Sequence, residues 1–89
     1  MFLGKVVGSV VATIKEGNLT GLKLLVVARL SANGRLTGEQ IVAADTVGAG
    51  VGDSVLVVTG SSARFTSSTA EAAVDAAIVG VVDKVDLGG

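Results

Sequence analysis

The chain contains no cysteine and no histidine among its 89 residues. It therefore can form no disulfide, no thiolate nucleophile, no Cys/His zinc site and no imidazole acid–base pair. Three carboxylates near the C-terminus, Asp75, Asp83 and Asp86, are spread along the sequence and on both faces of an expected strand, so they form no catalytic pair. We expect no metal, no cofactor and no enzymatic activity. The absence of cysteine also fits a cytoplasmic protein.

Aromatic residues and charge are scarce as well. The chain has two Phe, no Trp and no Tyr, and its formal net charge is −1 with no basic or acidic run. Single-stranded nucleic acid is bound by stacking aromatic side chains in a basic groove, and neither is present. No apolar run approaches the roughly 18–20 residues that span a bilayer, and no basic segment precedes an apolar block at the N-terminus. We expect no nucleic acid, no membrane partner and no signal peptide.

Hydrophobic residues, in contrast, are abundant: they make up 49% of the chain, and the mean hydropathy is +0.73. A domain this small buries only about 60% of the surface that its unfolded chain exposes. The excess of apolar side chains must leave an exposed patch, and such patches mark interfaces. Without disulfides or metals, oligomerisation is a natural source of stability. We predict one small domain over residues 1–89 that associates with copies of itself.

Apolar and polar residues alternate with a period of two along most of the chain, which predicts β-strands. The predicted strands cover residues 6–14, 22–32, 37–45, 53–59 and 76–85. Asn33-Gly34 predicts a hairpin turn between the second and third strands. Residues 70–77 are rich in alanine and could begin a helix, but Gly80 would cost that helix about 1 kcal/mol.

The fold class that follows is all-β, with at most one short helical turn near residues 61–65. Five short, apolar strands are expected to close into a small barrel of the OB type, because closure removes the exposed sheet edges.

A glycine-rich loop containing Gly48, Gly50 and Gly52 separates the third and fourth predicted strands. Its Gly-x-Gly-x-Gly spacing departs from the dinucleotide fingerprint, and a strand follows it where that fingerprint requires a helix. We interpret the glycines as structural, because they permit positive φ and close approach of backbones. Approach between symmetry-related chains is one form of this, so the three glycines are candidates for a subunit interface or a ring axis.

Three other residues are candidates for the same interface. Arg64 follows a Gly-Ser-Ser corner that is either a backbone anion nest or a capping turn, with capping favoured. No second basic residue adjoins Arg64, so polar contacts at a subunit seam suit it better than an anion site. Leu25 and Val27 are apolar positions on a strand face whose ends are charged. They are either subunit contacts or a second core layer, and the pattern leaves both open.

Four sequence blocks follow one another along the chain. The first is LGKVVG with VVAT at residues 3–8 and 10–13, and the second is LTGLKLLVV at 19–27. The third is DTVGAGVGD at 45–53, followed by VLV and GSSAR, and the fourth is VDAAIVGVVD at 74–83. In this order and spacing, the blocks resemble the EutN/CcmL family of bacterial microcompartment vertex proteins. Family members often carry a proline where this chain has Ala73, which affects the rigidity of the preceding loop.

The resemblance implies an OB-like five-stranded barrel assembled into a cyclic homopentamer. Such pentamers are structural proteins that close the vertices of a polyhedral shell in the bacterial cytoplasm, with hexameric shell proteins as facets and partners. Related vertex proteins serve carboxysomes and several catabolic compartments, so the type of compartment stays open. The alternative, based on the barrel alone, is a binding module for single-stranded nucleic acid or small anions.

Overall fold

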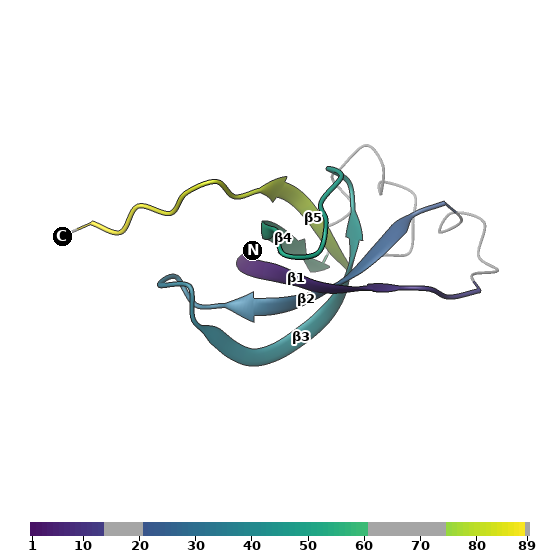
Figure 1. Ribbon diagram of the computed structural model, residues 1–89, viewed down its shortest axis with the longest axis horizontal. Helices are drawn as coiled ribbons and strands as arrows, with labels where there is room; N and C mark the ends of the chain where they lie inside the picture. The colour runs from purple at the N-terminus through teal and green to yellow at the C-terminus, as the bar shows by residue number, and fades with distance from the viewer. Residues whose placement is uncertain (14–20, 61–74, 89) are drawn as a thin grey trace.

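The computed structural model describes residues 1–13, 21–60 and 75–88, and within them the chain is all-β (Figure 1). The strands close into one barrel in the order β1-β2-β3-β5-β4, with β4 returning to pair with β1. The predicted all-β class and closed five-stranded barrel are confirmed. The helical turn predicted near residues 61–65 lies outside the described residues. The strands are β1 (Phe2–Val10), β2 (Lys23–Leu30), β3 (Leu36–Asp45), β4 (Ser54–Thr59) and β5 (Ala76–Val81).

The boundaries of β2, β3 and β4 agree with the predicted ones to within two residues, but the first and last strands differ. β1 begins at Phe2, four residues before the predicted start, and ends at Val10. A bulge between Val6 and Gly8 shifts the register of β1 against β2, yet burial still alternates along the strand, with Val6 buried and Lys5 and Val7 exposed. β5 ends at Val81 and not at residue 85, because the chain leaves the barrel there.

The hairpin predicted at Asn33-Gly34 connects β2 and β3, although its turn is not the two-residue type. The N–H of Gly34 donates to the carbonyl of Ser31 at 2.9 Å, and the N–H of Ser31 donates to the carbonyl of Arg35 at 2.8 Å. Gly34 has φ of 84°, whereas Asn33 does not have a positive φ. This is a three-residue loop with glycine in the left-handed position, the next most common hairpin connection.

Small and β-branched side chains fill the barrel interior. Leu25 is 1% exposed and Val27 is 0% exposed within the single chain, so both belong to the core layer. They have no free surface to offer a second subunit. Leu25 and Val27 lie on the inner face of β2, whereas Leu24 and Val26 lie on its outer face and are partly exposed. The buried cluster consists of Phe2, Val6, Leu25, Val27, Ala43, Ala49, Val55, Val57, Ala76 and Ile78.

Gly4 sets the spacing between β1 and β2. A Cβ at this position would lie 2.2 Å from Cγ1 of Val27 and 3.2 Å from the carbonyl oxygen of Ala28. Val27 therefore occupies the space that a side chain at residue 4 would need. One methyl group at this point would therefore have to displace the Val27 side chain of the neighbouring strand β2.

The barrel closes through a short parallel junction between β3 and β5. Only Ala44↔Ala77 and Asp45↔Ile78 are paired there. Thr46 extends this junction: its hydroxyl donates to the carbonyl of Ile78 at 2.6 Å, and its N–H donates to the same oxygen at 3.3 Å. A side-chain hydroxyl thus reinforces the shortest contact between strands in the barrel wall.

We expect Gly4→Ala to destabilise the protein by about 1–3 kcal/mol, because overpacking forces a stiff buried valine out of its place. Urea unfolding at a fixed protomer concentration measures this. Gly8→Ala is the matched control in the same strand, since a Cβ there meets nothing closer than 3.9 Å. An equal loss of stability in both variants would contradict the packing argument.

We expect Thr46→Val to lower stability by about 1 kcal/mol, since it removes one hydrogen bond while preserving side-chain shape. Hydrogen exchange of the β5 amides should accelerate, because the junction opens more often. Thr46→Ser retains the hydroxyl and should exchange like the original protein. Unchanged exchange in Thr46→Val would show that the hydroxyl contributes nothing to closure.

Candidate assembly loop

The glycine-rich loop, residues 46–53, runs from the end of β3 to the start of β4 and lies against β1. The N–H of Gly52 donates to the carbonyl of Val6 at 2.8 Å, and the N–H of Val6 donates to the carbonyl of Asp53 at 2.9 Å. These bonds continue the ladder in which Lys5 pairs with Ser54. The end of the loop is therefore held by the barrel wall itself.

A tight turn shapes the second half of the loop. The N–H of Asp53 donates to the carbonyl of Gly50 at 3.0 Å, and the N–H of Gly50 donates to Oδ2 of Asp53 at 2.9 Å. Gly52 has φ of 96° at the third position of this turn, where a type II turn requires a positive value. Gly52 is therefore glycine for a conformational reason.

A polar cluster holds the first half of the loop. Oδ1 of Asp45 accepts the N–H of Val47 at 3.1 Å, and Nζ of Lys23 lies 3.7 Å from Oδ2. The same Nζ donates to the carbonyl of Ala49 at 2.6 Å. The side chain of Asp45 is 2% exposed, so this charge is compensated by its partners and not by water. Lys23 thus joins the loop to β2.

The loop presents apolar side chains outward while its polar backbone is bonded inward. Val47 is 41% exposed and Val51 is 68% exposed, whereas Ala49 is fully buried between them. The N–H groups of Gly50, Gly52 and Asp53 are all donated within the chain. A phosphate cradle would need such amides to be free. The geometry suits a rigid contact surface better than an anion site.

The three candidate glycines of the loop differ in whether their backbone conformation favours glycine. Gly48 and Gly52 have φ of 78° and 96°, so both positions favour glycine. Gly50 does not have a positive φ, and a Cβ there would lie 4.0 Å from Oδ2 of Asp53, an ordinary contact. Among the residues that the structure describes, no contact explains glycine at residue 50. Arg64, the remaining candidate on this part of the chain, lies outside the described residues.

The polar cluster of Lys23, Asp45 and the carbonyl of Ala49 was not predicted. One signal for it was present in the sequence, since Lys23 and Asp45 are opposite charges at the ends of neighbouring predicted strands. Their pairing depends on the register, in which Lys23 faces Asp45 across the β2–β3 ladder. Register of this kind follows from the hairpin geometry, which the sequence predicted only approximately.

The carboxylates in the part of the chain that the structure describes form no cluster that could hold a metal ion. Within residues 1–13, 21–60 and 75–88, no group of three or more His, Cys, Asp or Glu side chains is placed to hold a metal ion. Asp75, Asp83 and Asp86 are exposed, and Asp86 pairs with Lys84 at 3.3 Å. The same ranges contain no helix with the length and apolar character that a membrane span needs.

Comparison with known proteins gives consistent matches over almost the whole chain. Residues 1–83 match the family described as ethanolamine utilisation protein EutN/carboxysome. The bacterial microcompartment shell vertex protein GrpN of Rhodospirillum rubrum is 51% identical over 86 residues, covering 97% of each chain. The shell vertex protein PduN of Salmonella typhimurium is 51% identical over 87 residues, covering 93% of this chain and 96% of its own.

A solved structure extends the similarity to three dimensions. The GrpN pentameric microcompartment shell protein from Rhodospirillum rubrum superimposes with a TM-score of 0.87 at 49% identity, covering 100% of both chains. The family match, the two relatives and this structure agree with the barrel and with the four sequence blocks. The chain therefore belongs to the EutN/CcmL family.

Proposed function

We propose that this protein is a structural component of a bacterial microcompartment shell, in which five copies form a closed ring at each vertex. The observation that carries the proposal is the full-length similarity to a shell protein solved as a pentamer. The residue types support a structural role over a catalytic one, because the chain lacks cysteine and histidine. On this proposal the protein works in the bacterial cytoplasm, within the shell.

The physical need for such a ring comes from geometry. A flat layer of hexagons has no curvature and cannot close on itself, whereas fivefold units introduce the missing curvature at corners. The partners of this ring are therefore hexameric shell proteins that form the facets. A closed ring uses the same contact five times, each copy offering one surface to its left neighbour and a different surface to its right neighbour.

The exposed apolar side chains of the single subunit support self-association. Val11 is 98% exposed and Val51 is 68% exposed. The other large exposed hydrophobic side chains lie on β1, β3 and β5 or in segments outside the strands. In a ring, neighbouring copies would cover those of these side chains that lie at the seam. The large exposed hydrophobics are Met1, Val7, Val11, Leu36, Val42, Val47, Val51, Val81, Val85 and Leu87.

The assembly loop is our candidate for part of the subunit seam or the ring axis. Its backbone is fixed at both ends, and it carries Val47 and Val51 on its outer side. Gly50 has a non-positive φ and no close neighbour in the described part of the chain, which is expected where the backbone of another subunit passes close by. Arg64 remains a candidate for the same seam on sequence grounds.

We expect native mass spectrometry to show a single closed assembly of five times 8.7 kDa, or 43.5 kDa, at micromolar protomer concentration. Multi-angle light scattering should give the same mass in solution. A stable, well-folded monomer under these conditions would refute the proposal. Salt-dependent binding of single-stranded DNA would instead favour the OB-type binding module.

We expect Gly50→Val to weaken the ring much more than it weakens the folded subunit, because residue 50 has room and an ordinary φ within one chain. The ring mass and the circular dichroism spectrum are measured on the same sample. Gly52→Val is the contrasting control, since its φ of 96° makes any side chain strained and should disturb folding itself. Rings of normal stability in Gly50→Val would exclude residue 50 from the seam.

A further inference from the structure

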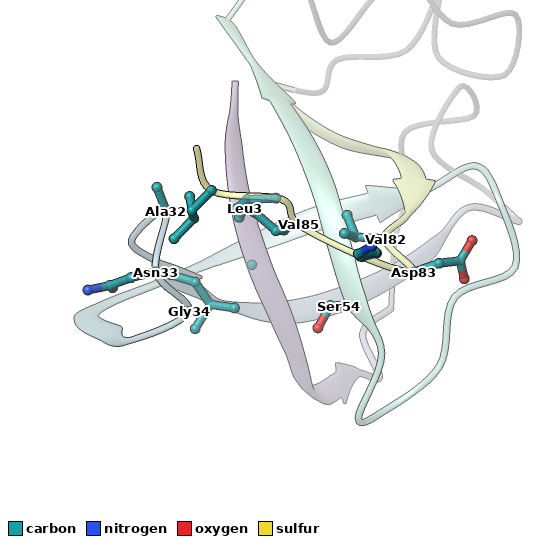
Figure 2. A pocket seen from close by; sticks show the side chains of 12 residues that line it. Leu3, Ala32, Asn33, Gly34, Ser54, Val82, Asp83 and Val85 are labelled. Carbon is teal, nitrogen blue, oxygen red and sulfur yellow. The ribbon is translucent and has the colours of Figure 1, made fainter. Parts of the chain in front are cut away.

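The tip of the β2–β3 hairpin carries an asparagine followed directly by a glycine, Asn33-Gly34. Such a pair is reactive, because the backbone nitrogen of the following residue can attack the side-chain amide of asparagine. Glycine has no Cβ to obstruct that approach. Asn33 and Gly34 are both exposed, and Figure 2 shows the Asn33 side chain directed away from the barrel wall. Water and hydroxide therefore reach the reacting atoms.

The Ser31 side chain contacts the amide that would be attacked. Its hydroxyl donates to Oδ1 of Asn33, the shorter of its two acceptor contacts, and the other acceptor, the carbonyl of Arg35, lies at 3.3 Å. The N–H of Arg35 donates in turn to Oγ of Ser31 at 3.3 Å. A hydroxyl on Oδ1 polarises the side-chain carbonyl, and it binds the oxyanion that forms during attack more strongly than the neutral amide. Ser31 is thus placed to lower the barrier to ring closure.

The attacking nitrogen is engaged in the folded hairpin, so the reaction requires a local opening. The N–H of Gly34 donates to the carbonyl of Ser31 at 2.9 Å. The register of the β2–β3 ladder shifts between Ala28 and Leu30, and Leu30↔Leu36 is the single ladder pair between this irregularity and the tip. A hairpin end held by so few bonds opens far more often than the whole barrel unfolds.

We propose that Asn33 is a site of spontaneous deamidation, at which the Gly34 nitrogen attacks Cγ of Asn33 while the Ser31 hydroxyl binds Oδ1. The nitrogen loses its proton to hydroxide, the new C–N bond closes a succinimide ring, and the amide NH2 leaves with a proton from water as ammonia. Water then opens the ring. Attack of water at the side-chain carbonyl gives aspartate, and attack at the backbone carbonyl gives isoaspartate.

The two products change the hairpin differently. Aspartate adds one negative charge and leaves the main chain unaltered, whereas isoaspartate also routes the main chain through Cβ and lengthens the loop by one methylene. Two bonds fix the present loop, from the N–H of Ser31 to Arg35 at 2.8 Å and from the N–H of Gly34 to Ser31 at 2.9 Å. A longer main chain cannot keep both, because loop length sets the hairpin geometry. Isoaspartate therefore loosens this end of β2 and β3.

This inference is independent of the proposed ring, because every contact that carries it lies within one subunit. The chain also supplies its own control, since it has two asparagines and the other, Asn18, precedes the bulky Leu19. Asn18 lies outside the described residues. Trypsin releases the two asparagines in separate peptides, residues 16–23 and 30–35.

We expect the folded protein, kept in mildly alkaline buffer, to deamidate at Asn33 at least about tenfold faster than at Asn18. Mass spectrometry of the two tryptic peptides, after digestion at slightly acidic pH, measures both rates. Asn33→Gln should abolish the change in the peptide of residues 30–35. Equal rates at the two asparagines would overturn the proposal.

Ser31→Ala tests the part played by the hydroxyl. We expect the deamidation rate at Asn33 to fall about tenfold, a small share of what an oxyanion donor contributes in a buried site. Ser31→Thr keeps a hydroxyl and should react like the original protein. Loss of the Arg35 contact loosens the hairpin and by itself raises the rate, so a fall reports the missing donor. An unchanged or higher rate in Ser31→Ala would overturn the role of Ser31.

The aged protein tests the consequence for the hairpin. Chromatography separates the isoaspartate form, and Asn33→Asp supplies the same charge on an unaltered main chain. We expect hydrogen exchange of the Ser31 and Gly34 amides to be about tenfold faster in the isoaspartate form than in Asn33→Asp. Equal exchange in the two proteins would overturn the loosening, because the added charge would then account for the whole effect.

Discussion

The limited space inside the barrel is the constraint on which the rest of the structure depends. At Gly4, the side chain of Val27 on the neighbouring strand β2 occupies the place where a Cβ would lie. The buried cluster consists mostly of valine and alanine, with three larger side chains. A chain that is 49% hydrophobic cannot place all of its apolar residues there, and the remainder lies on the outer surface. The proposed ring is the physical consequence, since neighbouring copies cover what one barrel cannot.

The assembly loop and the C-terminal tail, residues 82–88, differ in how firmly the barrel holds them. The loop is held by hydrogen bonds to β1 and by the Lys23–Asp45 pair, so its exposed valines sit on a fixed support. The tail is joined to the barrel by one backbone hydrogen bond among the described residues, from the N–H of Val82 to the carbonyl of Ser54.

Much of the fold could be predicted from the sequence. Period-two alternation marked β2, β3 and β4 closely, and glycine residues marked the hairpin turn at Gly34 and the loop before β4. In β1 the alternation identified the two faces correctly over residues 6–10, but it did not show that the strand begins at Phe2, because Gly4 has no side chain to mark the buried face. Leu25 and Val27 were ambiguous for another reason: alternation identifies two faces but not which of them points inward. The Lys23–Ala49 contact needed the three-dimensional register, which no local pattern contains.

The strand order also dictates when the fold can be completed. β5 lies between β3 and β4 in the barrel, yet it begins only at Ala76. During synthesis, β1, β2 and β3 can form a local meander early, whereas closure must wait until most of the chain has left the ribosome. Until then the outer edges of β1 and β3 are unpaired and open to strands of other nascent chains. The stage most exposed to aggregation is therefore the unfinished, open sheet that precedes the pairing of β5.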